Sequence, residues 1–163
     1  MSFRGPLCLL ATAVAVGCSS LNEPRPTLVS VTAVSGPTDL RIGDTVRVSI
    51  AIANVSRETV RISAGNCNND FVIEGANGKV YYPAETIYCL LALYPPVALE
   101  PGASFHLEGF TTGRVIPEGS MDAPVMLPAG IYNIRARVGV MKGDEAAVAV
   151  RSNPSAVTFR ARG

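Results

Sequence analysis

Short runs in which apolar and polar side chains alternate with a period of two residues recur along most of this chain. The clearest spans residues 46–54, where Val46, Val48, Ile50 and Ile52 alternate with arginine, serine and alanine. Because successive side chains of a β-strand point to opposite faces, this pattern predicts strands with one buried and one exposed face. Similar short runs lie at residues 60–63, 71–73, 104–108, 132–138, 148–150 and 157–159. The pattern therefore predicts an all-β domain.

Turn-forming residues separate these runs. They are Gly43-Asp44, Asn54 with Ser56, Gly75 to Gly78, Pro101-Gly102 and Ala129-Gly130. The Asn77-Gly78 pair indicates a β-hairpin, because an Asn-Gly pair tolerates positive φ angles. Many short strands, each with one polar face, favour a Greek-key β-sandwich. We expect residues 27–163 to form this domain, with the first strand over residues 27–34 and a helical turn near residues 85–93.

The first residues are typical of an export signal. Arg4 supplies a positive charge, and residues 7–16 are apolar apart from one threonine. This run has the length of a signal-peptide core and is shorter than the roughly 20 residues that span a bilayer. The following sequence, Ala15-Val16-Gly17-Cys18, resembles the lipobox of bacterial lipoproteins, with alanine where leucine is usual. We predict that residues 1–17 are removed and that Cys18 is lipidated. The alternative is a plain secretory signal with an incidental cysteine.

The segment after the predicted cleavage site is suited to a membrane tether. Residues 18–26 are mostly polar and contain two prolines. Ser19, and not aspartate, follows Cys18, which favours the outer over the inner membrane if the source is Gram-negative. We therefore predict an exported protein that its N-terminal lipid anchors to the membrane of the cell envelope.

The four cysteines have different predicted roles. Cys8 lies in the leader and Cys18 takes the lipid, which leaves Cys67 and Cys89 in an oxidising setting, where we expect a disulfide. Closing this loop would add about 3 kcal/mol of stability on the chain-entropy model. Two free thiols or half of a metal site are the alternatives. With His106 as the one histidine, a zinc ion would still lack a ligand. We expect no metal and no cofactor.

The sequence contains no recognisable catalytic motif. It has no G-x-S-x-G, H-E-x-x-H or S-x-x-K pattern. His106 lies on the polar side of an alternating run, as a solvent-facing strand residue would. The carboxylate pairs Asp70 with Glu74 and Glu100 with Glu108 come with no sign of a pocket. The net charge of +1 and the scattered basic residues argue against nucleic acid as a partner. We expect a protein that is not an enzyme.

Two segments are candidates for partner contacts. The first, residues 81–96, gathers Tyr81, Tyr82, Tyr88 and Tyr94, and tyrosine offers a large contact area at small entropic cost. Its alternative role is a connection that packs over the open end of the sandwich. The second segment, residues 111–128, is rich in glycine and proline and is predicted to be an irregular loop.

Four sequence blocks occur in an order that points to a known family. They are Gly43-Asp44-Thr45 with the strand after it, Asp70–Glu74 followed by Asn77–Tyr81, Leu99–Ser104, and Pro128–Ala136. Together they resemble the intracellular proteinase inhibitor family of BsuPI type over residues 41–138. This family tends to carry tryptophan after the Asn-Gly hairpin, whereas the chain has none. The resemblance implies an immunoglobulin-like sandwich.

These observations lead to one main expectation about function. The protein is expected to be a non-enzymatic, lipid-anchored module of the cell envelope with a proteinase-inhibitor-like immunoglobulin fold that binds a protein or polymer partner. The resemblance implies an alternative, a proteinase inhibitor acting through an exposed loop at residues 81–96 or 111–128, so that the partner would be a protease. A third reading is a structural lipoprotein that stabilises a larger envelope assembly.

Overall fold

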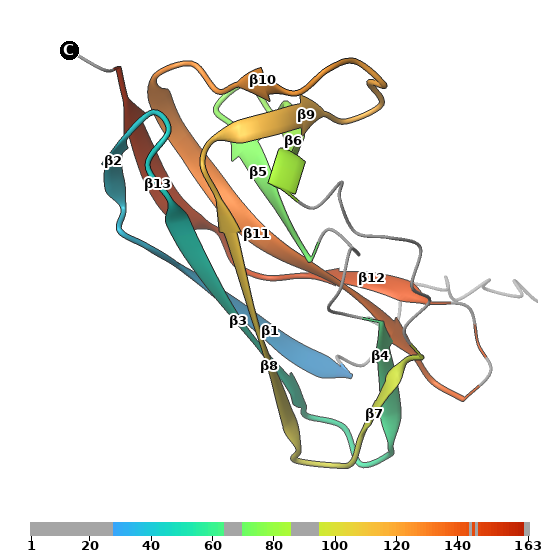
Figure 1. The fold of residues 1–163 in the computed structure, drawn as a ribbon. Helices are drawn as coiled ribbons and strands as arrows, with labels where there is room; N and C mark the ends of the chain where they lie inside the picture. Colours follow the sequence, from blue (N-terminus) through green and yellow to red (C-terminus); the bar gives the residue numbers. More distant parts are fainter. Residues whose placement is uncertain (1–27, 64–69, 86–94, 144, 146, 162–163) are drawn as a thin grey trace, which may run out of the picture.

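The structure, a computed structural model, describes residues 28–63, 70–85, 95–143, 145 and 147–161. Most of these residues lie in β-strands (Figure 1). The first strands are β1 (Val29–Gly36), β2 (Asp39–Arg41), β3 (Val46–Asn54), β4 (Val60–Ser63), β5 (Phe71–Gly75) and β6 (Val80–Pro83). The later strands are β7 (Val97–Leu99), β8 (Ser104–Thr111), β9 (Arg114–Pro117), β10 (Val125–Met126), β11 (Gly130–Met141), β12 (Val148–Arg151) and β13 (Ser155–Arg160).

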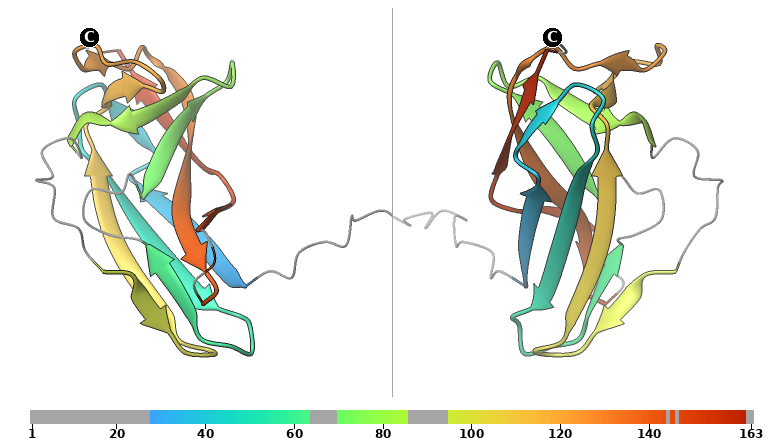
Figure 2. Two further views of the ribbon diagram at one scale, coloured as in Figure 1. Left: turned by 90° about the vertical axis from the view of Figure 1, so that its right-hand side faces the viewer. Right: turned by 60° about the vertical axis from the view of Figure 1, so that its left-hand side comes forward.

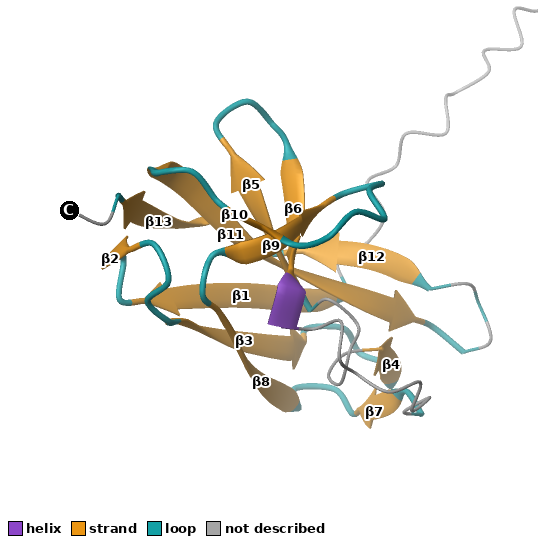
Figure 3. Cartoon of the chain, turned by 45° about the horizontal axis from the view of Figure 1, so that its top comes forward, coloured by secondary structure: helices purple, strands orange, loops and turns teal. Residues whose placement is uncertain are grey.

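The strands form two facing layers (Figure 3). The first layer consists of β1, β3 and β8, with β3 in the middle and antiparallel to both neighbours. The second layer is built around β11, with β5 and β4 along one edge and β13 and β12 along the other. The chain crosses from β3 to β4, returns at β8 and crosses again at β9, before β11. This is an immunoglobulin-like Greek-key β-sandwich.

The N-terminal strand is shared between the two layers. After β1 the chain turns at a cis Gly36–Pro37 peptide bond, and β2 then joins the second layer parallel to β13. Leu40 of β2 is buried as a result. The N-terminal segment therefore lies at the edge of both layers, with β1 in the first layer and β2 in the second.

The alternating runs explain the core. Val46, Val48, Ile50 and Ile52 of β3 are buried and their polar neighbours face outward, as the sequence pattern predicted. On the facing side, β11 alternates in the same way over its twelve residues. Removing such side chains from water is the main stabilising term of a sandwich of this size.

Tyr132 fixes the start of β11. Its hydroxyl donates a hydrogen bond to the carbonyl oxygen of Pro128 at 2.9 Å, and its ring meets Phe159 edge to face at 5.9 Å. A tyrosine at the start of this strand that bonds back to the preceding backbone is the tyrosine corner of immunoglobulin-like sandwiches. Burial raises the pKa of Tyr132, so the hydroxyl stays a donor.

The turns follow the sequence closely, with one exception. Gly78 has a φ of 76° and closes the β5–β6 hairpin, so the Asn77-Gly78 prediction is confirmed. Residues 111–128 were predicted to be irregular, and this was wrong: most of the segment forms the β9–β10 hairpin. Its strands are too short and too rich in proline to show an alternating pattern.

Several predictions fall on residues outside the described ranges. These are the lipidation of Cys18, the Cys67–Cys89 disulfide, the two tyrosines Tyr88 and Tyr94, and most of the helical turn near residues 85–93. Within the described ranges, the structure contains no helix long and apolar enough to cross a membrane.

Candidate partner-binding surface

The two candidate segments meet in the structure. β6 pairs with β9, so that Tyr81 lies opposite Pro117 and Tyr82 opposite Ile116, and β9 pairs in turn with β10. The β9–β10 hairpin therefore extends the second layer beyond β6 at the upper end of the molecule (Figure 1). Residues 81–85 and 111–128 together form one surface, which we call the hairpin end.

The corner before β9 is held by a compact set of hydrogen bonds. Thr111 is fully buried and its Oγ1 accepts a hydrogen bond from the backbone N–H of Gly113 at 3.1 Å. Gly113 has a φ of 78°, and a Cβ there would lie 3.3 Å from the ring of Phe159, so glycine suits the position on both counts. Its carbonyl accepts from the N–H of Leu127 at 2.8 Å. The hairpin thus leaves the sandwich at a fixed angle.

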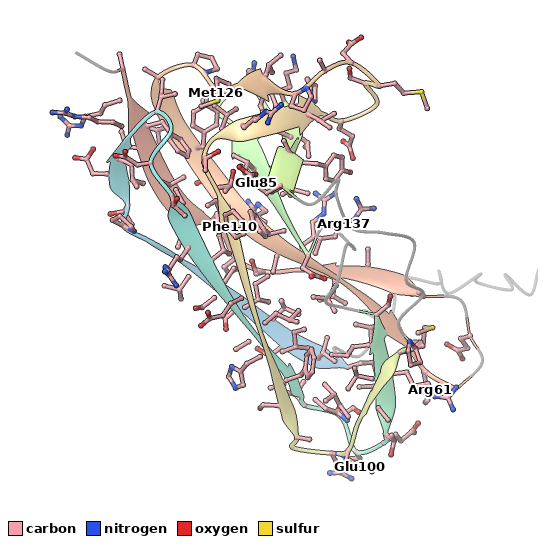
Figure 4. All side chains as sticks on the ribbon, in the orientation of Figure 1. Arg61, Glu85, Glu100, Phe110, Met126 and Arg137 are labelled. Atoms are coloured by element: carbon pink, nitrogen blue, oxygen red, sulfur yellow. The ribbon has the colours of Figure 1, made fainter. Side chains whose placement is uncertain are left out.

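Glu85 ties the end of β6 to this corner. Its Oε1 accepts hydrogen bonds from Thr112, at 3.0 Å from the backbone nitrogen and 2.6 Å from Oγ1. Its other oxygen, Oε2, is buried and has no hydrogen-bond partner among the residues that the structure describes. Buried oxygens without partners are rare and destabilising. The hairpin end therefore contains a buried oxygen that the described part of the fold does not satisfy, on the Glu85 side chain labelled in Figure 4.

The two described tyrosines have different environments. Tyr81 is directed inward, where its ring contacts Tyr132 edge to face at 6.4 Å, and the Nζ of Lys79 lies 5.5 Å from the ring centroid. Tyr82 faces outward, and its hydroxyl donates to Oε1 of Glu118 at 2.6 Å. Of the two, only Tyr82 offers its ring and hydroxyl on the outer surface.

The Tyr82 hydroxyl also accepts a hydrogen bond from Nη1 of Arg137 at 3.0 Å. The pKa of Tyr82 is raised above its ordinary value of 10.0, chiefly because the hydroxyl donates to Glu118, and also because the side chain is partly buried. Arg137 acts in the opposite direction. The phenol is therefore held neutral between a cation and a carboxylate.

The tip of the hairpin exposes several large apolar side chains. Met121 is fully exposed, and Val125 and Met126 remain 47% and 43% exposed. Leu127, the next residue, is 1% exposed. The tip is internally ordered, since Ser120 Oγ donates to Asp122 at 2.7 Å. A hydrogen-bonded turn thus presents these side chains to solvent, and Figure 4 labels Met126 among them.

A group of arginines lies next to Tyr82 on the outer face of the second layer. Arg135 and Arg137 project from β11, and Arg151 of β12 lies directly opposite Arg137. Arg135 Nε donates to Glu74 Oε2 at 2.6 Å, and Arg151 Nη1 is 3.6 Å from Glu74 Oε1. The sequence analysis missed this cluster. Its one visible signal was the pair of arginines at alternate positions of the run at 132–138.

The other groups considered for chemistry are separated. His106 is exposed on the outer face of β8, as predicted, and Glu74 is engaged by arginines. Glu100 accepts a hydrogen bond from Thr59 at 2.7 Å on the surface. Among the residues that the structure describes, no three His, Cys, Asp or Glu side chains are grouped so as to hold a metal ion.

Comparison with known proteins assigns no family. No protein-family model matches the chain, and no curated protein matches it. Among solved structures, the C-terminal domain of wzt is similar with a TM-score of 0.47 and 10% identity, over 82% of this chain and 74% of that one. The structural-genomics target SoR45 gives 0.43 and 14%, over 79% and 83%. The Pseudomonas fluorescens DNA glycosylase AlkC, bound to DNA containing an abasic site analog, gives 0.42 and 13%, over 82% of this chain and 30% of its own. Similarity at this level assigns no activity to the chain.

Proposed function

We propose that this protein is a non-enzymatic, lipid-anchored module of the cell envelope that binds a protein or polymer partner through its hairpin end. The observation that carries the proposal is the exposure of Met121, Val125 and Met126 on an ordered hairpin whose neighbouring side chains, Val115 and Leu127, are buried. The fold buries Val115 and Leu127 but leaves Met121, Val125 and Met126 exposed to solvent. Large apolar side chains that an ordered hairpin leaves in water are candidate contacts for a partner.

The residue types at this end support the proposal. Methionine, tyrosine and arginine are enriched at the centres of protein interfaces, and Met126, Tyr82 and Arg114 lie on neighbouring strands here. Methionine is well suited to such a surface because its flexible, polarisable side chain adapts to different partners.

The position of the hairpin suits an anchored protein. β1 begins at Val29, opposite Asn54, and ends at Gly36, opposite Arg47. The hairpin follows Thr111, which lies opposite Val46, so it stands at the far end of β1 (Figure 2). Eight strand residues separate these ends by about 26 Å. A lipid on Cys18 would connect to the chain at the start of β1, and the hairpin end would point away from the membrane.

Photo-crosslinking in living cells tests the binding surface. A benzoylphenylalanine is placed at Met126 and, as the control, at Val55, which is also exposed but lies at the opposite end. We expect Met126 to give one discrete crosslinked species that an excess of the unlabelled protein removes, and Val55 to give none. Equal crosslinking from both positions, or none from Met126, would contradict the proposal.

The anchor is tested separately. Cys18→Ser should abolish incorporation of labelled fatty acid and release the protein from the membrane fraction. Retention of the variant in the membrane would show that the anchor assignment is wrong. Cys8→Ser is the matched control, because Cys8 lies within the leader that we expect to be removed.

The second candidate function is a proteinase inhibitor. The observation that favours it is the turn between β9 and β10, which projects a fully exposed Met121 while strand pairing holds both of its ends. A loop of this kind can enter a protease cleft and resist cleavage. The purified full chain is titrated against serine proteases and metalloproteases. Stoichiometric, saturable inhibition that Met121→Asp removes would support this candidate, and no inhibition at high excess would eliminate it for those classes.

A further inference from the structure

The arginine cluster, composed of Arg135, Arg137 and Arg151, has an unusual pairing. Arg137 and Arg151 are direct cross-strand partners of β11 and β12, so both side chains lie on the same outer face. Like charges directly opposite each other destabilise an antiparallel pair. The fold relieves this in part through Glu74, which contacts Arg151 and Arg135. Among the residues that the structure describes, no carboxylate forms an ion pair with Arg137.

Arg137 is the least neutralised member of the cluster. Among the described residues, its side chain has one hydrogen-bond partner, the neutral hydroxyl of Tyr82 at 3.0 Å, and no carboxylate within ion-pair distance. A guanidinium has five N–H donors in a planar fork that matches a carboxylate in two-point contact. Because Tyr82 takes one of these donors, it holds the fork in place, and the other donors form no side-chain hydrogen bond with a residue that the structure describes.

We propose that Arg137 and Arg151 form a carboxylate-binding site that takes an aspartate or glutamate side chain from an acidic segment of a protein partner. This inference rests on the proposed function and identifies the chemistry of the partner. The incoming carboxylate would lie between the two guanidinium groups, relieve their repulsion, and replace water there. Tyr82 acts as a positioning residue that orients Arg137.

The surroundings favour a protein over a phosphate polymer. The cluster contains three arginines, and three acidic residues lie within it or at its edge: Glu74, Glu118, and Asp70, which lies just before β5 across from Arg137. A polyanion would have to pass these carboxylates and would need a longer basic stripe, whereas the net charge of the chain is +1. Next to Tyr82, the partly exposed Ile116 offers an apolar contact that suits side chains flanking an acidic residue. One or two acidic side chains on a folded or extended segment match this size and charge.

Peptide binding tests the site. The full chain, purified in detergent, is titrated into a short fluorescein-labelled peptide of alternating aspartate and serine, with an asparagine–serine peptide as the control ligand. We expect saturable anisotropy with the acidic peptide only. Arg137→Gln should weaken binding about tenfold, the effect of about 1.4 kcal/mol. Arg151→Gln should weaken it less, because its side chain is 52% exposed and already contacts Glu74.

Matched variants keep the test specific. Arg57→Gln removes the same charge from the exposed β3–β4 turn and should leave the affinity unchanged. Arg137→Lys keeps the charge but not the fork and should fall between the wild type and Arg137→Gln. Thermal unfolding of each variant checks the fold. If Arg137→Gln is unstable, Arg151→Gln takes its place as the test, because it leaves the hydrogen bond between Arg137 and Tyr82 intact.

Three results would overturn the inference. They are equal binding of the asparagine peptide, an equal loss in Arg57→Gln, or displacement of the acidic peptide by inorganic polyphosphate at lower concentrations than by the unlabelled peptide. The last result would identify a phosphate polymer as the ligand. If crosslinking from Met126 persists while the acidic peptide fails to bind, this inference fails and the proposed function stands.

Discussion

The two ends of the sandwich solve their hydrogen-bonding problems differently. Asn54, the last residue of β3, lies at the end of the sandwich where β1 starts, and its side chain is buried. Its Nδ2 donates to the carbonyls of Glu58 and Leu99, both at 2.8 Å. Its Oδ1 accepts from the backbone and hydroxyl of Ser56 at 2.9 and 2.7 Å. One side chain thus joins the β3–β4 turn to β7, and every polar atom that it brings has a partner.

The hairpin end is less self-sufficient. Oε2 of Glu85 is buried and has no partner within the described ranges, and Met121 and Met126 are exposed to solvent. A buried polar group with full hydrogen bonding adds stability and specifies one structure, whereas an unpaired one lowers stability. The Asn54 end therefore stabilises the fold, while the hairpin end retains groups that a partner can contact.

The largest effect is expected at the Asn54 end. Asn54→Ala removes the Nδ2 donor to the carbonyls of Leu99 and Glu58 and the acceptor of the Ser56 N–H, so we expect the free energy of unfolding to fall by about 3 kcal/mol. Denaturant unfolding monitored by circular dichroism measures this. Ser56→Ala, which removes one half-buried hydroxyl from the same network, should lower it by less than about 1 kcal/mol. If the two variants were equally stable, Asn54 would not be the central residue of this end.

A smaller loss is expected at Glu85. Glu85→Ala removes the acceptor for Thr112 and should lower the free energy of unfolding by about 1–2 kcal/mol. Glu85→Gln keeps one acceptor oxygen for Thr112, so it should lose less stability than Glu85→Ala. A Gln variant as unstable as the Ala variant would mean that the hydrogen bonds to Thr112 do not account for the loss.

The methionines should matter little for stability. Met121→Ala and Met126→Ala alter exposed side chains, and we expect changes within about 0.5 kcal/mol in the free energy of unfolding. Both should nevertheless reduce crosslinking to the partner. Val55→Ala, an exposed apolar change at the other end, is the control for both measurements. A large loss of stability in either methionine variant would show that the hairpin tip belongs to the core.

The smallest effect concerns the titration of Tyr82. Its folded-state pKa is raised, so the neutral phenol contributes stability that is fully present below pH 10.0 and is lost as the pH rises through the folded pKa. Glu118→Gln removes the main cause and should move this pKa down. Phenolate absorbance, taken as the difference between each protein and its Tyr82→Phe counterpart, isolates the signal. An unchanged curve would mean that Glu118 does not control Tyr82.

The strands could be predicted from the sequence because their pattern is local. The alternation in β3 and β11 and the turns at Gly78 and Gly102 depend on neighbouring residues, and the structure confirms them. The β9–β10 hairpin could not be predicted, because its short strands are defined by pairing with β6 and not by their own periodicity.

The site was predicted only in part, and the reason is register. Both candidate segments were found from their composition, but their contact requires Tyr82 to lie opposite Ile116. The arginine cluster requires Arg137 to face Arg151 across β11 and β12, and Glu74 to reach Arg135, 61 residues away. Such pairings are set by strand order and are invisible in single runs of sequence.

A paired measurement of stability and partner capture tests the central claim most directly. Asn54→Ala and Met126→Ala are compared for the free energy of unfolding and for photo-crosslinking from a benzoylphenylalanine at Met121, normalised to folded protein. We expect Asn54→Ala to lose stability and keep crosslinking, and Met126→Ala to keep stability and lose crosslinking. Loss of both properties in each variant, or the reverse assignment, would contradict a division between a stabilising end and a binding end.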